Sequence, residues 1–591
     1  MASSVTSTQR RPRSCDPKVT MGTAVGVGCA LAAKAACTTA VSGEAFLPVF
    51  QAATSSAAAE VTALRPTRLS GSATQASPSQ HAALAAAATA VLAHSCGRRR
   101  SRASLSAVAD LSTRSTQLPK VDRSSTKSFR RDLVRSEQYF KFGKSQMASA
   151  MDKLMTISGS ELITKMRENG FKLQVGDVTF VLAESYGFCW GVERAVAMAY
   201  EARNYFPDKN VWVTNELIHN PVVNQNMTDM GFSFIKKTAE GGKDFEDVQK
   251  GDVVILPAFG ATVDEMAFLK EREVQIVDTT CPWVSKVWNS VEKSKDKGHT
   301  AIIHGKYDHE ETVATKSFAE KFIVVKNMDE AEYVANYVLN GGDREEFLKK
   351  FVKAVPEGFD PDTDLERVGV ANQTTMLKGE TELIGKLFER VMIRKYGPQN
   401  IDSHFVSFNT ICDATQERQD AMYKMFGAEY EAPASALYAD LEGEQVGLEL
   451  KTEKNQEKLS SKEMEDATRG AAAAEKVDLS KVDFCLVIGG YNSSNTTHLL
   501  EIAEDKKVPA YHIDGAHRIG GLDPENLLNV IEHKPMSTSP ADAMLDQGLE
   551  VTKNFIPDGP VVVGVTSGAS TPDSEVGDCL QRLLAVRGLK A

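Results

Sequence analysis

The stretch VTFVLAESYGFCWGVERAVAMAYEA, residues 178–202, joins a short apolar strand to an amphipathic helix through a loop that contains a cysteine. The same order recurs in VQIVDTTCPWVSKVWNSVEKS at residues 274–294 and in FVSFNTICDATQERQDAMYKM at residues 405–425. A short apolar run followed by a helical apolar period predicts a strand and then a helix each time. One local unit therefore occurs three times in this chain of 591 residues.

The cysteines of these units are Cys189, Cys281 and Cys412, out of nine in the chain. A lone cysteine at a helix start usually only packs, but three in one repeated context favour a shared role. Three thiolates aimed at one point suit an iron–sulfur cluster with one free iron corner, because a structural zinc site normally has four ligands. The chain has no C-x-x-C pair, and the odd cysteine number argues against a disulfide framework. Cys485, within the apolar run VDFCLVIGG, is expected to be a buried strand residue.

Each cysteine unit is followed by two further strands that end in polar loops, so strand, loop and helix recur three times in each of three segments. Strands that alternate with helices predict parallel sheets, and ligands bind such sheets beyond the carboxyl ends of the strands. We therefore expect an α/β protein with three similar lobes around a pseudo-threefold axis. The alternative is a single, larger doubly wound sheet.

The first 125 or so residues differ in composition from the rest of the chain. They are rich in Ala, Ser, Thr and Arg and carry an excess of basic residues, although the whole chain has a net charge of −11. This asymmetry is typical of an organelle-targeting sequence joined to an acidic enzyme. An apolar run from Met21 follows a basic start and precedes a Ser/Arg-rich stretch, which predicts a plastid reached through the secretory route. A disordered Ala/Ser tail is the alternative, and no later segment predicts a membrane span.

The rest of the chain divides at changes in pattern. A charged, acidic stretch at about 426–476 interrupts the third repeat and predicts a surface insertion that is partly disordered. The predicted parts are a targeting presequence (1–125), an N-terminal extension (126–175), lobe 1 (176–277), lobe 2 (278–404), lobe 3 with the insertion (405–575) and a C-terminal segment (576–591).

Polar residues gather in the loops after the predicted strands. His219 in ELIHNP and His309 in YDHEE hold corresponding strand ends, where histidine can bind anions when charged and donate hydrogen bonds when neutral. The run Ser493–Asn495 and Ser570 in GASTPD each open a helix, where they could be caps only. Helix N-termini also expose N–H groups with partial positive charge, so several aimed at one point would hold a diphosphate.

Glu311 and Thr374 form a second candidate group. Glu311 lies two residues after His309, and Thr374 lies in the next loop of the same segment. A carboxylic acid and a hydroxyl can form a short proton relay, which an iron–sulfur enzyme needs because its cluster supplies electrons only. Glutamates are common on protein surfaces, so the hypothesis depends on the pairing with Thr374.

Nine segments match one protein family in order: ESYGFCWGVERA, TNELIHNP, LPAFGATVDEM, VDTTCPWVSKVW, HGKYDHEETVAT, ANQTTMLKGET, FNTICDATQERQDAMYK, GGYNSSNTTHL and GVTSGASTPD. On these segments the chain resembles, from about Lys127 to its C-terminus, the 4-hydroxy-3-methylbut-2-enyl diphosphate reductases, which act last in the methylerythritol phosphate route to isoprenoids. The resemblance is closest to the plastid and cyanobacterial branch.

The resemblance implies a trefoil of three α/β domains with parallel sheets around a central [4Fe–4S] cluster. The cluster would have three cysteine ligands and one open iron, which takes the substrate's allylic oxygen. The implied reaction is the reductive dehydroxylation of (E)-4-hydroxy-3-methylbut-2-enyl diphosphate by two electrons and two protons, and its products are isopentenyl diphosphate and dimethylallyl diphosphate.

The resemblance also assigns roles by motif position. The cluster ligands would be Cys189, Cys281 and Cys412. The diphosphate would be held by His219, Ser493, Asn495 and Ser570, with Ser494 close by. Proton delivery would fall to His309, Glu311 and Thr374, with Glu311 as the leading donor and Gln373 supporting that loop. His309, Gln373 and Thr374 are also expected to contact substrate.

The sequence departs from the family pattern at two places, and the resemblance also implies an electron-donor partner. Phe259 stands where bacterial members have a diphosphate-contacting histidine, so the diphosphate must be held differently, and the insertion is outside the family pattern. A ferredoxin is the expected electron donor, with Lys120, Arg123, Lys127, Arg130 and Arg131 as a candidate basic docking patch. A homodimer is left open, and no nucleic acid and no membrane span in the mature protein are expected.

Two other classes of function compete with this reading. A cluster-bearing dehydratase would also use three cysteines and an open iron, but it would turn over without reductant. A non-catalytic binder could use an intact cluster to sense iron or oxygen. A sensor needs neither diphosphate-type loops nor the Glu311–Thr374 pair, so these features argue against it.

Overall fold

The computed structural model describes residues 118–141, 158–238, 242–431, 435–443, 482–521 and 526–590, with a few single positions between them. All of them belong to one compact unit, Ser101–Ala591. Most of the predicted presequence and the insertion beyond residue 443 lie outside the described residues. Within the described part, no helix combines the length and apolar character that crossing a membrane requires.

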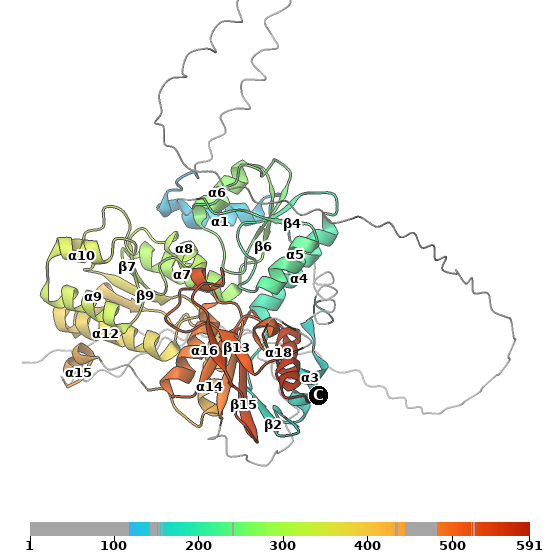
Figure 1. The fold of residues 1–591 in the computed structure, drawn as a ribbon. Coiled ribbons are helices and arrows are strands. Elements are labelled where there is room, and N and C mark those ends of the chain that lie inside the picture. The colour runs from blue at the N-terminus through green and yellow to red at the C-terminus, as the bar shows by residue number, and fades with distance from the viewer. Residues whose placement is uncertain are drawn as a thin grey trace, which may run out of the picture. The chain divides into compact units, whose positions relative to one another are not determined.

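Three sheets form the framework, and their strands are parallel apart from one N-terminal addition (Figure 1). The first sheet contains β3 (Val211–Val213), β4 (Phe232–Phe234), β5 (Val253–Leu256) and β6 (Gln275–Asp278). The second contains β7 (Thr300–His304), β8 (Phe322–Val325), β9 (Val368–Asn372) and β10 (Phe405–Ser407). The third contains β1 (Lys172–Val175), β2 (Val178–Leu182), β11 (Phe484–Ile488), β12 (Ala510–Ile513) and β15 (Val561–Ser567).

The helices connect these strands and cover the sheets, as expected where strands are buried on both faces. β7, β9 and β11 are examples, because every residue in them is buried. The helices are α3 (Glu161–Glu168), α4 (Trp190–Tyr205), α5 (Pro221–Asp229), α6 (Val263–Glu271), α7 (Pro282–Asp296), α8 (Glu310–Lys316), α9 (Met328–Asn340), α10 (Arg344–Lys350), α11 (Pro361–Asp364), α12 (Lys378–Tyr396), α13 (Ile401–His404), α14 (Asp413–Met425), α16 (Ser494–Asp505), α17 (Pro540–Ala543) and α18 (Asp573–Val586).

The three sheets share one strand order. The orders are β4-β3-β5-β6, β8-β7-β9-β10 and β12-β11-β15-β2, and in each the last strand leads directly into a cysteine. The third sheet also has β1, antiparallel to β2, and an antiparallel pair follows β12, namely β13 (Val530–His533) and β14 (Glu550–Lys553). The repeated order confirms the α/β class and three similar lobes, and it excludes a single doubly wound sheet for the described chain.

The predicted lobe boundaries need a correction at the strands before the cysteines. β2, expected in lobe 1 (176–277), pairs with β15 and so completes the third sheet, where Figure 1 shows the teal strand beside the red one. β10, expected in lobe 3 (405–575), pairs with β9 of the second sheet. Local sequence shows that a strand exists, but its hydrogen-bond partner is set by contacts far away in the chain.

The N-terminal segment from residue 118 packs against the first two lobes, through a 3₁₀ turn, η1 (Arg123–Ser125), and α1 (Thr126–Arg135). Arg123 forms two hydrogen bonds with Asp264, and Leu133 is buried in the core. Arg123, which falls within the range predicted as presequence (1–125), therefore packs on the folded unit.

The same packing weakens the predicted basic docking patch. Arg123 is paired with Asp264, and Arg130 is paired with Glu292 and lies over the Trp288 ring. Arg131 also lies 3.7 Å from Asp132, so three of the five expected cations already have an acidic partner within the protein.

The start of the predicted insertion also packs on the second lobe. A short helix, α15 (Ala436–Gly443), buries Leu441 in the same core as α12, and Arg390 of α12 lies 4.3 Å from the centre of the Tyr438 ring. This part of the range 426–476 is thus a docked element, whereas residues 444–481 lie outside the described part.

Candidate active site

The three predicted cysteines occupy one equivalent position in the three lobes. Cys189, Cys281 and Cys412 are the N-cap residues of α4, α7 and α14. Each cysteine N–H donates to a backbone carbonyl in the loop after a neighbouring strand. Cys189 donates to Ala569 after β15 at 3.1 Å, Cys281 to Ala258 after β5 at 3.0 Å, and Cys412 to Thr374 after β9 at 3.4 Å. We call these three side chains the thiol centre.

The thiols of this centre face one another. A β-carbon added at Gly191 would lie 2.6 Å from Cys281 Sγ and 3.9 Å from Cys189 Sγ, so glycine is required for these two thiols to approach α4. Cys412 lies close to both of these thiols, because they add to the effect of burial in raising its pKa. The structure thus brings together the three cysteines that the sequence singled out.

The donor set fits a cluster better than a single ion. Two thiolates on one tetrahedral metal lie within ~4 Å of each other, given Zn–S bonds of about 2.3 Å. The three sulfurs do not form a group within 4.8 Å among the described residues. Burial raises the pKa of Cys281 and of Cys412 to about 12, so their thiolates require a bound cation. Helix N-termini favour the same ionised form.

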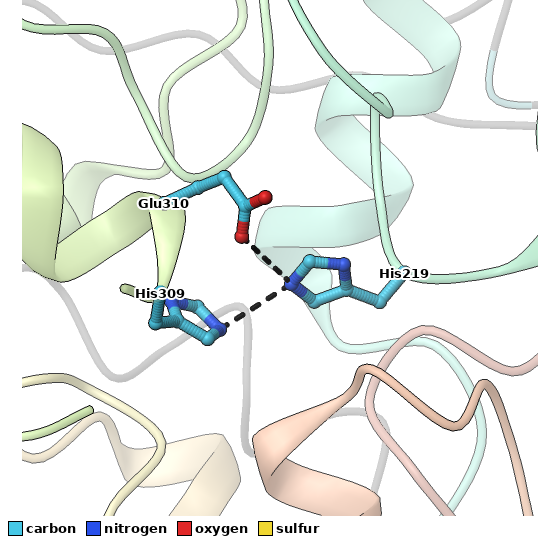
Figure 2. A group of neighbouring side chains, drawn as sticks. All are labelled: His219, His309 and Glu310. Atoms are coloured by element: carbon cyan, nitrogen blue, oxygen red, sulfur yellow. Dashed lines mark hydrogen bonds and ion pairs between the residues drawn. The ribbon is translucent and has the colours of Figure 1, made fainter. Parts of the chain in front are cut away.

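A pair of histidines from different lobes lies beside this centre, and we call it the histidine pair. His219 follows β3 and His309 caps α8, and their Nε2 atoms are 3.3 Å apart (Figure 2). Glu311 N–H donates to His309 Nδ1 at 3.1 Å, so His309 carries its proton on Nε2 and donates to His219. His219 Nδ1–H can then donate to Glu216 Oε2 at 3.0 Å. The pair therefore forms a directed chain of hydrogen bonds.

The charges around the pair keep His309 neutral and Glu310 ionised. Burial, followed by the effect of His219, lowers the pKa of His309. Burial alone would raise the pKa of Glu310, but the interactions with His219 and Lys237 outweigh it and lower the pKa. Glu310 Oε2 lies 3.9 Å from His219 Nε2, as Figure 2 shows. Together, His219, His309 and Glu310 could also hold a metal ion, because their ligand atoms lie within 4.8 Å.

Phe259 takes part in the pair as a flat support. Its ring stacks on His219 at 4.1 Å between centroids and 20° between planes, and it meets His309 edge-on at 6.0 Å. A phenyl ring cannot donate a hydrogen bond, so Phe259 contributes orientation where a third histidine would contribute a proton. The departure noted in the sequence therefore has a visible structural role.

Glu311 and Thr374 are joined by two hydrogen bonds, as the relay hypothesis requires. Glu311 is 2% exposed, and its Oε1 accepts from Thr374 N at 2.7 Å while its Oε2 accepts from Thr374 Oγ1 at 2.9 Å. Burial raises the pKa of Glu311 to about 7 in spite of these bonds. Gln373 braces the loop, because its Oε1 accepts from Lys306 N and Thr312 Oγ1 and its Nε2 donates to Thr375 Oγ1.

The third lobe presents buried donors that lack protein partners. Ser493 caps α16, and Ser494 Oγ and Asn495 Nδ2 are buried without a hydrogen-bond partner in the described structure. Asn495 Oδ1 accepts from Ala569 N at 3.0 Å, next to the buried Ser570, and this bond fixes the direction of the amide. Because the Ala569 carbonyl accepts from Cys189, this loop connects the α16 N-terminus to the thiol centre.

Sequence reasoning missed the carboxylates that hold the His219 loop. Glu216 Oε2 accepts from both His219 and Asn492 Nδ2, the latter at 2.6 Å, and so links lobes 1 and 3. Asn220 Nδ2 donates to Glu575 Oε2 at 2.8 Å, and burial raises the pKa of Glu575 to about 7. Glu216 and Asn220 could have been found from the sequence, because they lie beside His219 in TNELIHNP. The sequence around Glu575 gives no such indication.

Comparisons with known proteins show the family of this chain. The family model described as "LytB protein" matches residues 180–432 and 449–584. A protein of Cyanothece sp. named "4-hydroxy-3-methylbut-2-enyl diphosphate reductase" is 51% identical over 462 residues, 78% of this chain and 98% of the relative. A protein of the same name from Gloeothece citriformis is 52% identical over 466 residues, 79% of this chain and 99% of the relative.

A solved reductase from Plasmodium falciparum is a more distant likeness. It is 19% identical, covers 68% of this chain and 87% of its own, and superposes with a TM-score of 0.42. The family assignment therefore depends on the sequence matches.

Proposed function

The chain belongs to the LytB protein family, and we propose that it reduces (E)-4-hydroxy-3-methylbut-2-enyl diphosphate to isopentenyl diphosphate and dimethylallyl diphosphate. The observation that carries this proposal is the convergence of three equivalent thiols on one point beside a buried carboxyl–hydroxyl pair. The chain spans 98% of the first relative's length, so the comparison covers nearly the whole of that protein.

The thiol centre would hold a [4Fe–4S] cluster through Cys189, Cys281 and Cys412, leaving one iron open. When bound, such a cluster supplies electrons one at a time and a Lewis-acidic position for the substrate's hydroxyl oxygen. Gly191 keeps α4 free of a side chain at this point, so the cluster can approach its N-terminus.

The diphosphate would be held by donors that have no partner in the protein. Ser494 Oγ, Asn495 Nδ2 and the N-terminal N–H groups of α16 are suited to an anion, and the N-terminus adds partial positive charge. His219 and His309 could reorient their N–H donors toward the same anion. We place Ser493 and Ser570 in this group as well, since both are buried on the connecting loops.

Glu311 would supply protons through Thr374. Because Thr374 N–H must donate to Oε1, the acidic proton belongs on Oε2, where it can be donated to Thr374 Oγ1. The hydroxyl then releases its own proton toward the substrate. The balance is one allylic alcohol, two electrons and two protons giving one alkene and one water: the C–O bond breaks, one C–H bond forms and the oxygen leaves as water.

The electrons would come from a ferredoxin, and the setting would be a plastid. The cyanobacterial relatives support a plastid origin, and the basic, Ala/Ser-rich start of the chain supports a signal-plus-transit presequence. The net charge of −11 is unfavourable for an acidic ferredoxin, so docking would have to use local contacts.

One experiment tests the proposal directly. The protein is purified without oxygen and mixed with the hydroxylated allylic diphosphate and chemically reduced ferredoxin, and both alkene products are measured. We expect turnover that stops when the reductant is left out. Turnover without reductant would instead indicate a dehydratase, and an iron-free protein with full activity would remove the cluster from the mechanism.

A further inference from the structure

A buried arginine connects two of the three cysteine loops. Arg418 lies in α14, six residues after Cys412, and is only 3% exposed. Its Nη2 donates to the carbonyl oxygens of Gly187 at 2.6 Å and Tyr186 at 3.2 Å, just before Cys189, and its Nη1 donates to Ala414 O at 2.8 Å. The guanidinium therefore fixes the loop of one cysteine from the helix of another.

The positive charge of Arg418 is not compensated by an ion pair. Its partners are neutral carbonyl groups, and within the described chain no carboxylate pairs with it, although Glu417 and Glu193 act on it from farther away. Its Nε–H is buried without a partner. An unpaired buried cation is costly, since arginine stays protonated, so this location favours an anion that the protein itself does not supply.

Burial lowers the pKa of Arg418, and the thiolates of Cys189 and Cys412 oppose this effect more strongly than Glu417 and Glu193 do. A cluster bound by three thiolates is anionic, and it becomes more negative by one charge each time it accepts an electron. A fixed cation stabilises the reduced form more than the oxidised form and so raises the reduction potential.

We infer that Arg418 is a positioning residue that tunes the thiol centre: it raises the reduction potential of the bound cluster while fixing the loop before Cys189. This inference rests on the proposed function, because it needs the cluster at the three cysteines. The electron itself comes from an external one-electron carrier of the ferredoxin class, and no proton transfer is involved in the step.

Arg194 provides a matched control within the same architecture. It lies in α4, five residues after Cys189, and donates to the carbonyl oxygens of Thr279 at 3.4 Å and Thr280 at 3.2 Å, just before Cys281. Arg194 is half-buried, so water screens its charge more than it screens the charge of Arg418. It shares the loop-fixing role but should contribute less to the potential.

The test uses the anaerobically purified full-length holoprotein. Iron and sulfide content are measured first, and the cluster is then titrated against ambient potential with electron paramagnetic resonance as readout. R418Q should lower the midpoint potential so that the reduced-to-oxidised ratio at fixed potential falls about tenfold, which is about 59 mV for one electron. R418M, which fills the space without a charge, should do the same, R418K should stay near the wild type, and R194Q should shift less than R418Q.

Each outcome decides the inference. An unchanged potential in a loaded R418Q or R418M protein, or an equal shift in R418K, overturns it, because charge would then not be the cause. If both neutral variants fail to retain iron, retention in R418K supports the role of the charge, and loss in R418K as well overturns it in favour of structure alone. A wild type without iron overturns both this inference and the proposed function, whereas a loaded wild type without turnover overturns the proposed function only.

Discussion

The thiol centre and the histidine pair lie on neighbouring loops, yet they are prepared in opposite ways. The histidine pair is joined into a chain that ends on Glu216, and Phe259 supports its ring, so its hydrogen bonds are complete within the protein. The thiol centre has high pKa values and an unpaired cation at Arg418. The histidine pair must therefore exchange hydrogen bonds within the protein for hydrogen bonds to a ligand. The thiol centre instead needs a bound charged group to stabilise its thiolates and to compensate Arg418.

The largest expected effect comes from removing one thiol. Cys412→Ser, like the same change at Cys189 or Cys281, should abolish nearly all activity and most bound iron, because three ligands are the minimum for an open-corner cluster. Iron and sulfide analysis with electron paramagnetic resonance measures this. Cys485→Ala is the control, since Cys485 is buried in β11, and full occupancy in Cys412→Ser would contradict the assignment.

A loss of the acidic proton should come next in size. Glu311→Gln keeps the shape and the bond from Thr374 but cannot supply a proton, so kcat should fall by roughly 10²–10⁴ with the cluster retained. Near-normal kcat in the fully loaded variant would remove Glu311 from the mechanism. His309 or a bound water would then be the donor.

The same carboxyl should determine the pH dependence of the wild type. Burial raises the pKa of Glu311 to about 7, so its protonated, proton-donating form is lost as the pH rises through that value and kcat should fall. Glu575→Gln is the matched control, because Glu575 also has a raised pKa of about 7 but contacts Asn220. The fall should persist in Glu575→Gln. A rate that rises through pH 7 would show that the ionised form is the active one.

Changes at the diphosphate donors should affect binding more than chemistry. Asn495→Ala removes the fixed amide donor, so KM should rise by roughly tenfold, about 1.4 kcal/mol, while kcat changes less. Steady-state kinetics with cluster content held equal measures the split. A fall in kcat at constant KM would place Asn495 in proton delivery instead.

The smallest effect is expected at the N-terminus, and here the structure changes the expectation from sequence. A chain starting at residue 118 should match the full-length protein, but one starting at Thr126 loses the Arg123–Asp264 pair and should melt about 1 °C lower for a loss of about 1 kcal/mol. Equal melting temperatures would show that this partly buried pair contributes nothing measurable, as is often found for ion pairs near surfaces.

The sequence was sufficient for features that are local and repeated. Three strand–cysteine–helix units were visible because apolar runs and helical periods occur within about 25 residues, and Glu311 and Thr374 were visible as strand-end polar residues. The pairing of β2 with β15 was not visible, because parallel strands carry no local signal of their partner. Arg418 was missed for a related reason: a helical arginine is usually solvated, and only tertiary packing buries it against the Gly187 carbonyl.

The closure of the third sheet by β2 also sets an order of events during synthesis. The bond from Gly187 N to Ser567 Oγ joins residues 380 positions apart, so the loop that aims Cys189 cannot be completed until the last strand has emerged. At about 5–20 residues per second, the first cysteine waits on the order of 20–80 s for its neighbours. The first two lobes can fold as they are made, but a truncated chain that ends before β15 has no place to assemble a three-cysteine cluster. If the proposed cluster binds at this centre, we therefore expect it to be loaded only into chains that have been translated through β15.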